Sequence, residues 1–564
     1  MNKKLLRKKL ALMLATLKKK RKYYCEVEYL EGTGTQYIDT GLDYFADFEI
    51  GIQLRTSVSN KALGNGAYFC MQRIRGSNPC WQFTNGGSTY SYNSQTLITE
   101  HHVMKWKDDK VYADGVFLSD LVKSLNTPNR MYLYTTGTSN KYPNVIYFCK
   151  LWNPDNGELV RDFIPVLDWD MTPCMYDRVT EQLFYNQGTG DFTAGREIHP
   201  VDYLESTGVE YIDTGIKFDG ANTKIELKTY ENSLTTRHSI CGDDGNFFYY
   251  FRGTGNWAVG YNGTAANIDS YMSVGDNVFV MDKNNVYVNG VLAKTYTASS
   301  SVSAYNALLF NRKTSLVDNG AVTMYYCKIW NNDVLVRDYI PAIDENGVGF
   351  MLDRVGHTCF LNQGTGAFKY PAREVEYLTS DGNQYIDTGI QPTDDYGYKI
   401  RNTYTRGGGE QCAIGCMDTG NRFVGIYTSG AENQLSGAWG SFVGFLPTYA
   451  WATGDILDVE VNYKNSRKMI VGGTELKDIS DLHISGTISN TLYLFARHYG
   501  STITKMQGKI YGVEITNGQN VVVDFIPAFK DGQIGMYDKV SGVLKTNIGT
   551  GSFIIGKIVE PEYE

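Results

Sequence analysis

The chain has 564 residues, which is too long for a single hydrophobic core, and its 42 Tyr, 25 Phe and 59 Gly against 13 Pro favour strands joined by tight turns. No run of about 18 or more apolar residues occurs, which excludes a membrane-spanning helix. The net charge is −8, but ten of the 53 Lys and Arg residues fall within residues 1–22, so the remaining body has 43 basic against 61 acidic side chains and a net charge of −18. A body this acidic is unsuited to nucleic acid, because binding phosphates requires a positive surface.

Residues 1–24 form a basic arm. Leu6, Leu10, Met13 and Leu17 fall on one face of a predicted helix, with the basic residues at both of its ends. The apolar run "LALMLATL" is shorter than that of a secretory signal and is followed at once by basic residues, so we do not expect secretion by this route. The arm is compatible with a membrane surface, an acidic partner, nucleic acid, or solvent alone.

One motif then occurs three times. "YLEGTGTQYIDTG", "YLESTGVEYIDTG" and "YLTSDGNQYIDTG" begin at Tyr29, Tyr203 and Tyr377, at intervals of 174 residues. This period is far longer than a solenoid unit, so each copy is predicted to be a complete domain with its own core. The predicted domains are residues 25–198, 199–372 and 373–564.

The copies share an order of short predicted strands. Alternating runs such as "DFEIGIQLR", "TKIELKTY" and "YKIRNTY" indicate strands with one face on a core. The hairpins "VYADGVFL", "VYVNGVLA" and "MIVGGTEL" follow, then "MYLYTT", "ALLFNR" and "LYLFAR". Each copy closes with "VRDFIP", "VRDYIP" or "VVDFIP" and a hairpin ending in "NQGTG" or "NIGTG". Many short strands without a helical period predict a β-sandwich or jelly roll.

This order of motifs resembles the concanavalin A-like lectin/glucanase superfamily, in its laminin-G-like branch, over residues 25–556. The opening and closing motifs are also similar to repeated lectin-like modules in proteins of gut bacteria and their tailed phages. The resemblance implies an all-β chain of three tandem antiparallel sandwiches behind a short basic N-terminal helix. It also implies that ligands lie on the concave sheet or in rim loops, often beside a calcium ion.

Several aspartates recur in all three copies, and we interpret them as structural. An Asp before Thr-Gly suits a turn, where its carboxylate accepts backbone N–H bonds. A second set lies in the "DFIP" stretch, and a third stands beside Arg178, Arg354 and Lys539 and is predicted to link the first and last strands of a copy. The aspartates are Asp39, Asp213 and Asp387, then Asp162, Asp338 and Asp524, then Asp177, Asp353 and Asp538.

No catalytic constellation recurs with these motifs. Glucan hydrolases of the resembled superfamily carry two carboxylates on one strand face within Glu-x-Asp-x-Glu or Glu-x-Asp-x-x-Glu. The nearest match, "ILDVEVNY" at 456–463, has Asp458 and Glu460 without a third partner and without an equivalent in the other copies. We therefore predict that the chain is not an enzyme.

Carbohydrate binding needs aromatic faces and planar polar groups, and the stretches that differ among copies are the better candidates. Three are aromatic and glycine-containing: 80–93, 247–263 and 440–451. The alternative is that their tryptophans lie in the core. The candidate ligand residues are Trp81, Tyr90, Tyr249, Arg252, Trp257, Trp439 and Trp451.

Metal binding is a weaker prediction. "CGDDGNFF" at 241 and "CMDTGNRF" at 416 place Asp243, Asp244 and Asp418 in glycine-containing loops that suit Ca²⁺, or that are simply polar turns. Cysteine positions in one copy are Phe, Gly, Leu or Val in others, which favours free thiols and a reducing compartment over disulfides.

Together these features predict a non-catalytic, multivalent protein that binds a cell-surface glycan or polysaccharide. We expect a virion-associated phage protein, assembled in a bacterial cytoplasm and attached to other virion proteins through residues 1–22, with oligomers possible. The alternatives are a structural or decoration virion protein without sugar binding, and an adhesin on a bacterial surface.

Overall fold

The computed structural model describes residues 21–560 with internal gaps, and within them the chain forms strands β1 to β52 and two single turns of 3₁₀ helix, Asp269–Tyr271 and Tyr463–Asn465. The predicted N-terminal helix falls in residues 1–20, outside the described part. The internal residues outside it are 55–59, 66–67, 76–77, 86–88, 94–100, 123–129, 136–142, 232–237, 244–246, 252–256, 313–320, 419, 421, 429–433 and 441–448.

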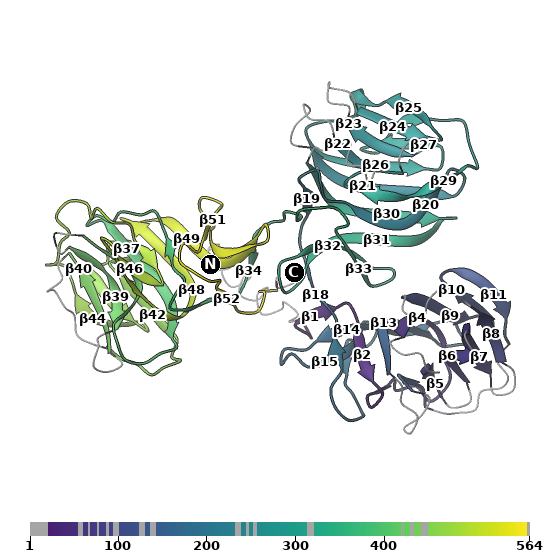
Figure 1. Ribbon diagram of the computed structural model, residues 1–564, viewed down its shortest axis with the longest axis horizontal. Helices are drawn as coiled ribbons and strands as arrows, with labels where there is room; N and C mark the ends of the chain where they lie inside the picture. Colours follow the sequence, from purple (N-terminus) through teal and green to yellow (C-terminus); the bar gives the residue numbers. More distant parts are fainter. Residues whose placement is uncertain are drawn as a thin grey trace, which may run out of the picture. The chain divides into compact units, whose positions relative to one another are not determined.

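The chain divides into two compact units. Figure 1 labels their strands. The first comprises Met1–Phe368 with Glu560–Glu564, and the second comprises Lys369–Val559. The first unit therefore contains two sequence repeats and the second unit contains one. The exact domain limits taken from the repeat remain predictions, but the strand pairing follows the repeat closely.

The first repeat forms two antiparallel sheets. The larger contains the row β11-β10-β9-β4-β13-β14-β15-β16, to which β1 (Cys25–Val27) and β2 (Leu30–Thr33) add by pairing with β14 and β13, and the smaller has six strands in the order β3-β12-β5-β6-β7-β8. The row in the larger sheet is Val116–Asp120, Lys110–Ala113, His102–Lys107, Asp47–Leu54, Pro143–Trp152, Leu159–Leu167, Pro173–Asp177 and Gln182–Phe184. The smaller sheet is Ile38–Asp39, Tyr132–Leu133, Asn60–Gly64, Tyr68–Arg75, Asn78–Asn85 and Thr89–Asn93.

The second repeat builds the same pair of sheets. Its larger sheet runs β28-β27-β26-β21-β30-β31-β32-β33, and its smaller sheet runs β20-β29-β22-β23-β24-β25. The larger sheet is Val291–Thr295, Asn285–Val288, Gly275–Asp282, Thr223–Glu231, Val322–Asn331, Val334–Ile343, Gly349–Asp353 and Thr358–Leu361. The smaller sheet is Ile212–Asp219, Val302–Leu309, His238–Gly242, Phe248–Phe251, Trp257–Tyr261 and Thr264–Asn267.

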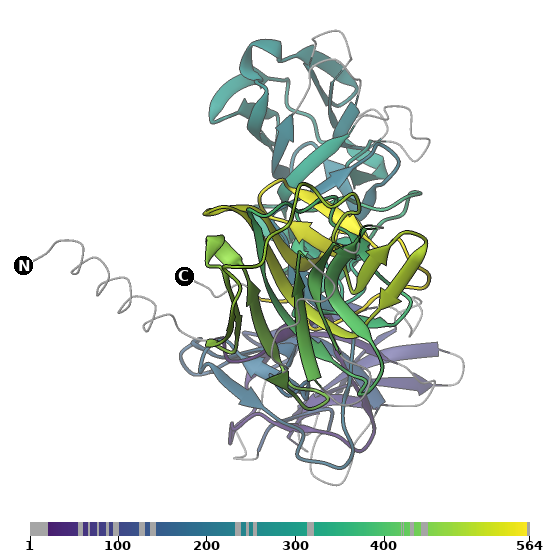
Figure 2. The same cartoon turned by 90° about the vertical axis from the view of Figure 1, so that its left-hand side faces the viewer.

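The third repeat is the second unit, whose strands are green to yellow in Figure 2. Its sheets run β44-β43-β42-β37-β48-β49-β50-β51 and β36-β45-β38-β39-β40-β41, with β46 (Ala496–Tyr499) added parallel to β38. The larger sheet is Thr474–Asp478, Lys468–Val471, Leu457–Val461, Tyr396–Tyr404, Gln507–Asn517, Asn520–Lys530, Gln533–Asp538 and Val543–Thr546. The smaller sheet is Ile386–Asp387, Tyr493–Leu494, Gln411–Met417, Phe423–Thr428, Gln434–Trp439 and Tyr449–Ala450.

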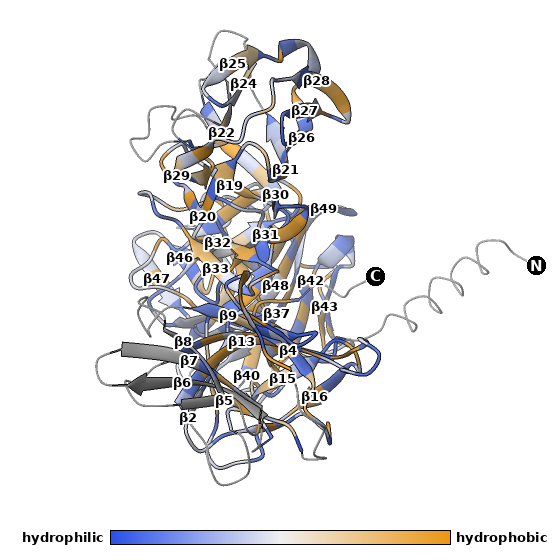
Figure 3. Cartoon of the chain, turned by 90° about the vertical axis from the view of Figure 1, so that its right-hand side faces the viewer, coloured by the Kyte–Doolittle hydropathy of each residue, from blue (hydrophilic) through white to orange (hydrophobic). Residues whose placement is uncertain are grey.

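Each pair of sheets encloses a core, as the period-two sequence pattern predicts. Along β9 and β26 buried and partly exposed residues alternate, and in both units apolar and polar ribbon segments lie side by side (Figure 3). In the first repeat Phe48 and Trp106 of the larger sheet meet Phe83 of the smaller sheet, with ring centroids 6.3 and 6.2 Å away. The predicted all-β sandwich architecture is thus confirmed.

The opening and closing motifs of each repeat are joined to each other. The side-chain oxygen of Asn186, Asn362 or Asn547 accepts the backbone N–H of the opening-motif tyrosine at 3.1 Å in each case. The glycine two residues further on is needed for this approach: a Cβ on Gly188 would lie 2.0 Å from the Thr35 carbonyl oxygen. "YIDTG" and "NQGTG" are therefore two halves of one clasp that fixes the start of a repeat to its end.

The recurring aspartates form local hydrogen bonds. Asp39, Asp213 and Asp387 each accept the N–H of the glycine two residues ahead, at 2.8–2.9 Å. The buried carboxylates of the third set accept N–H groups from the adjoining strand and the following turn, as Asp177 does from Asp162 at 2.8 Å.

The basic partners of those aspartates do not act as predicted. Arg354 binds Asp338 at 2.6 Å and Lys539 binds Asp524 at 2.9 Å, so these ion pairs connect consecutive closing strands instead of the first and last strands. The reason is register, because the hairpin after "DFIP" brings its arginine or lysine back beside the aspartate it has just passed. In the first repeat, Arg178 also reaches Glu26 of the first strand, with 3.7 Å between the guanidinium nitrogen and the carboxylate oxygen.

A short strand joins the two repeats of the first unit. The N-terminal half of β18 (Glu197–Pro200) pairs with β1 (Cys25–Val27), and its C-terminal half pairs with β31. The larger sheets of both repeats are thereby continuous in hydrogen bonding. Among the described residues, no helix has the length and apolar character needed to span a membrane.

Candidate functional site

The smaller sheet of the first repeat carries a tyrosine pair on its outer face. In β3 and β12, Asp39 lies opposite Tyr132 while the core residues Ile38 and Leu133 face each other. Because side chains alternate along a strand, Asp39 and Tyr132 both point away from the core. Tyr37 is partly buried, and one side of it packs against the core cluster. The rings of Tyr37 and Tyr132 meet edge to face with centroids 5.7 Å apart, and both are partly exposed.

Charged groups border this tyrosine pair. Arg130 Nε donates to Asp39 Oδ1 at 2.7 Å, and Arg130 Nη1 donates to Asp43 Oδ1 at 2.8 Å. These hydrogen bonds raise the pKa of Arg130, which stays charged. Burial and the Asp39 carboxylate raise the pKa of Tyr132, which keeps its hydroxyl proton. The first repeat therefore presents two aromatic rings beside a fixed carboxylate–guanidinium–carboxylate group, here named the tyrosine face.

The other repeats do not present the same face. In the second repeat Leu308 replaces Tyr132 opposite Asp213, and it is 5% exposed. In the third repeat Tyr493 lies opposite Asp387, but His498 stacks on its ring at 4.4 Å and Tyr385 lies on it at 5.5 Å. Three copies of one scaffold thus carry three different surfaces.

Three of the predicted ligand tryptophans are core residues. Trp257 is 2% exposed and packs on Phe279 of the opposite sheet, with ring centroids 6.3 Å apart. Trp439 is 1% exposed, and Trp451 is 6% exposed and packs on Tyr404. Burial corrects the sequence interpretation, because an indole inside a sandwich offers no face to a sugar.

Of the remaining predicted ligand residues, only Tyr90 has a side chain within the described part of the structure. The Tyr90 hydroxyl donates to the Leu118 carbonyl oxygen at 3.2 Å, and its ring packs on the core of the first repeat. The backbones of Trp81 and Tyr249 lie in β7 and β23, but their side chains are outside the described part, as is the whole of Arg252.

Trp439 reaches a partly exposed cluster of charged and polar side chains in the second unit. Asp394 accepts hydrogen bonds from Trp439 Nε1 at 3.3 Å, His483 Nδ1 at 2.8 Å and the Ile484 N–H at 2.9 Å, and it is paired with Arg467. Burial acts to raise the pKa of Asp394, but hydrogen bonds from Arg467 and His483 outweigh it and hold that pKa well below its usual range.

This cluster gives a pH dependence. A carboxyl whose pKa is lower in the folded state stabilises the fold above about pH 4, its unfolded value, and loses that contribution as the pH falls. We expect Asp394→Asn to lower the stability of the second unit by about 1–2 kcal/mol at pH 7 and by less at pH 3. Thermal unfolding of the full chain from pH 7 to pH 3 checks this; equal losses at both ends of the range would contradict it.

The predicted metal ligands are largely engaged in local bonds. Asp418 is 2% exposed, and it binds Arg422 through Nε at 2.7 Å and two backbone N–H groups. The guanidinium already supplies the positive charge that calcium would bring. Asp243 is 1% exposed and accepts the Phe247 N–H at 2.7 Å within a turn. Asp244 lies outside the described residues.

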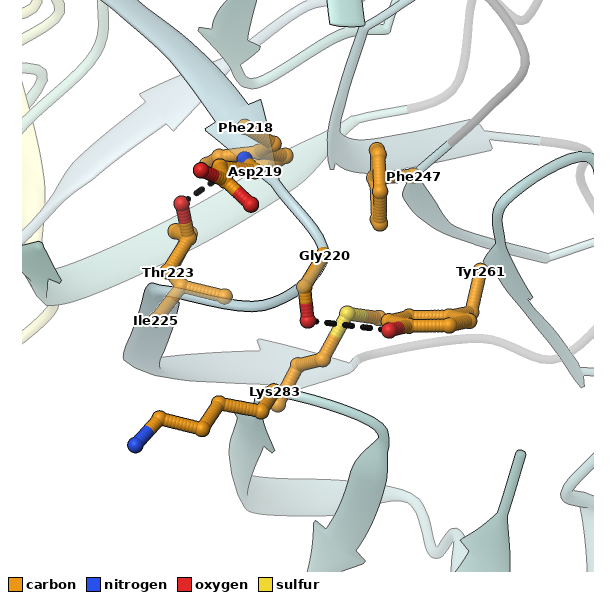
Figure 4. Close-up of a pocket in the computed structure, with 9 residues that line it drawn as sticks. Phe218, Asp219, Gly220, Thr223, Ile225, Phe247, Tyr261 and Lys283 are labelled. Carbon is orange, nitrogen blue, oxygen red and sulfur yellow. Dashed lines mark hydrogen bonds between the residues drawn. The ribbon is translucent and has the colours of Figure 1, made fainter. Parts of the chain in front are cut away.

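The second repeat and the second unit each contain a cavity, and neither offers an exposed aromatic ring as the tyrosine face does. The cavity in the second repeat, about 10 Å³, lies where Tyr261 donates to the Gly220 carbonyl oxygen at 2.9 Å (Figure 4). It has room for a single water molecule. A shallow cavity of about 350 Å³ in the second unit is lined by Gln533, Thr546, Asn547 and loop glycines. Its one aromatic lining residue, Phe553, is 5% exposed and offers no stacking surface.

The residues of the tyrosine face were missed in the sequence because they lie in shared motifs. Tyr37 and Asp39 belong to "YIDTG", which is common to all copies, whereas a binding site is expected in stretches that differ among copies. One signal was present: aligning the repeats places Tyr132, Leu308 and Tyr493 at one position. The eight cysteines whose side chains are described form no disulfide, as the sequence predicts.

Comparison with known proteins gives structural similarity alone. No protein-family model and no curated protein matches the sequence. Among solved structures, the chain is similar to the LG1-3 region of the laminin alpha2 chain, with 8% identity, a TM-score of 0.25, and 95% of this chain and 100% of that chain covered. It is also similar to domains LG4-5 of the mouse laminin alpha1 chain, with 9% identity, a TM-score of 0.20, and 55% of this chain and 90% of that chain covered.

Proposed function

We propose that the chain is a non-catalytic protein that binds carbohydrate on a cell surface through the tyrosine face of its first repeat. The observation that carries this proposal is the pair Tyr37 and Tyr132, partly exposed, beside Asp39 and Arg130. Sugar rings have an apolar face of C–H groups and a rim of hydroxyls. They are therefore recognised by an aromatic ring together with charged hydrogen-bonding groups held in place.

The ionic group of this face is already organised for that role. Arg130 is held by two carboxylates. Its side chain is nevertheless 38% exposed, and the side chain of Asp43 is 75% exposed. Carboxylate oxygens accept from sugar hydroxyls and a guanidinium donates to them, so the group offers both functions within one patch. Little conformational entropy is lost when such a group binds, because its side chains are held before the ligand arrives.

Absence of catalysis is part of the proposal. The strand that holds the nearest sequence match to a hydrolase motif is β42, and both of its carboxylates are paired across to β37: Glu460 with Lys399 at 3.3 Å and Asp458 with Arg401 at 3.8 Å. Glycoside hydrolysis needs one carboxyl to donate a proton and another to attack or to activate water. Two exposed ion-paired carboxylates in one repeat do not supply that division of roles.

The biological setting is part of the proposal and is supported by the repeats and the basic arm. We place the chain on a phage virion, attached through residues 1–22 to another virion protein, with its acidic repeats displayed. Because the three repeats present different surfaces, avidity would come from several copies of the chain on one particle, and not from three equal sites in one chain.

The rival is a structural virion component that binds no sugar. It is favoured by the burial of Trp257, Trp439 and Trp451, which removes the aromatic loops as platforms. Those indoles lie inside individual repeats, however, so they give no sign of repeats stacking on one another or on a capsid. An adhesin on a bacterial surface would use the same tyrosine face and differs only in what the arm holds.

A glycan array of the full chain, run with calcium and again with a chelator, tests the proposal. Tyr132→Leu installs the residue that the second repeat carries at this position and is compatible with the fold. We expect it to weaken binding at least about tenfold, or ~1.4 kcal/mol. Tyr211→Ala is the matched control, because it removes the equivalent of Tyr37 from the repeat without a ring partner, and it should leave binding unchanged.

Each other outcome has a definite meaning. A folded protein that binds no glycan would contradict the proposal and favour the structural component. Binding that is unaffected by Tyr132→Leu would place the site elsewhere. Binding lost only in chelator would return attention to the turns that contain Asp243 and Asp418.

A further inference from the structure

Three side chains of metal-ligand type meet where the two repeats of the first unit join. Cys25 lies on β1, and Glu197 and His199 lie two residues apart on β18, which places both on one face of that strand. The pairing of Glu26 with Ile198 and Val27 with Glu197 sets Cys25 across from His199. Figure 1 labels the two strands, β1 and β18. One donor atom from each of the three side chains lies within 4.8 Å of the other two.

The group is sheltered from solvent. Cys25 and His199 are fully buried, and the Glu197 side chain is 17% exposed. His199 Nε2 lies 2.8 Å from Glu197 Oε2, and Nδ1 lies 2.5 Å from Glu560 Oε1. Glu560 also accepts from Arg21 at 2.9 Å. A thiol, an imidazole and a carboxylate, with a second carboxylate behind the imidazole, thus meet at one strand pairing.

From this geometry we propose that Cys25, Glu197 and His199 form a zinc site that locks β1 to β18. Sulfur, imidazole nitrogen and carboxylate oxygen are the three ligand types of protein-bound zinc, which accepts four ligands in a tetrahedron. Zinc would bind His199 through Nε2, in place of the present hydrogen bond to Glu197. Nδ1–H would remain directed at Glu560, the arrangement in which a carboxylate orients a metal-binding histidine.

The negative groups of the site suit a dication. Sulfur binds zinc as a thiolate, so the Cys25 thiol proton leaves when the metal enters, and the Nε2 atom that binds zinc carries no proton. The dication would lie beside the carboxylates of Glu197 and Glu560, which already surround the His199 ring. Filling the site therefore does not bury a positive charge without negative groups near it.

The repeat pattern sets this site apart from the shared scaffold. The position that is Cys25 in the first copy is His199 in the second and Arg373 in the third. Two equivalent positions therefore meet across β1 and β18. Both carry a residue type that binds metals, whereas the third copy does not. This inference is independent of the proposed carbohydrate function, since the tyrosine face uses none of these residues.

The test is metal analysis of the full chain, prepared without a histidine tag. We expect one zinc per chain, and a cobalt-loaded protein with a thiolate-to-cobalt charge-transfer absorption. Cys25→Ser should abolish that absorption and the bound zinc, and His199→Gln should release most of the zinc. Cys174→Ser is the control, because it removes a buried thiol of the same repeat outside the group; it should keep both signals.

A stability measurement guards against variants that simply unfold. Chelator should lower the unfolding temperature of the native protein and leave that of folded Cys25→Ser unchanged. Folded native protein that takes up neither zinc nor cobalt would overturn the proposal and leave His199 as a charged hydrogen-bonded group. Zinc retained equally by Cys25→Ser would overturn it as well, by showing that the metal lies elsewhere.

Discussion

Replacing Phe553 by alanine is expected to lower the stability of the second unit by about 3–5 kcal/mol, the usual cost of removing a buried phenylalanine. Phe553 is 5% exposed, and its ring lies 4.9 Å from that of Phe495. Phe495 has a φ of 60°, a conformation that bulky residues rarely adopt and that costs about 1–3 kcal/mol. The packing between the two rings must outweigh that strain.

The same arrangement recurs in every repeat. Tyr134 and Phe310 also have positive φ, at 65° each, and they pack on Phe192 and Phe368 with centroids 4.7 Å apart. In each case the second ring follows the closing "NQGTG" or "NIGTG" motif. The contact therefore anchors the clasp between the start and the end of a repeat to the core beneath it.

Calorimetric unfolding of the full chain measures this effect. Phe553→Ala should shift one transition strongly and leave the transition of the first unit in place. Ile554→Ala is the matched control, because its side chain is 67% exposed and its loss should change stability by less than about 0.5 kcal/mol. Equal shifts for the two variants would mean that the ring pair does not hold the clasp.

Trp257→Ala is expected to destabilise the first unit by about 3–5 kcal/mol. Its indole packs on Phe279 of the opposite sheet and meets His238 edge to face at 5.3 Å. His238 in turn lies 2.8 Å from Glu231 within the buried region, so the loss of the indole also loosens a buried hydrogen bond. Any loss of ligand binding in this variant would report lost folding.

Two further variants separate these effects. Tyr305→Ala removes a ring that is 60% exposed in the same repeat and should change stability by less than about 0.5 kcal/mol. Trp257→Phe keeps an aromatic core side chain and should retain carbohydrate binding in full. Urea unfolding followed by fluorescence gives the stabilities; a Trp257→Ala protein as stable as Tyr305→Ala would show that the indole is not a core residue.

The fold was largely predictable from the sequence, and the site was not. Period-two alternation and turn dipeptides are local signals, so they placed the strands of three sandwiches. The role of Asp39, Asp213 and Asp387 in turns was also local, because the hydrogen bond spans two residues.

The sequence has no comparable local pattern that shows which side chains are buried or which distant residues are in contact. Trp257 and Trp439 lie in polar, glycine-containing stretches. Trp257 nevertheless packs across the sandwich on Phe279, and Trp439 donates a hydrogen bond to the distant Asp394. The tyrosine face and the Cys25–His199 pairing likewise depend on which strands are neighbours. Comparison of equivalent positions in the three repeats was the one route to them from sequence.

The most direct test of the proposed binding role is to count the ligand molecules bound per chain. Titration calorimetry of the full chain with the strongest glycan from the array should give one site, and none in Tyr132→Leu, because the tyrosine face is open only in the first repeat. Three equal sites that persist in Tyr132→Leu would contradict this, since they would show that ligand binds residues common to all repeats.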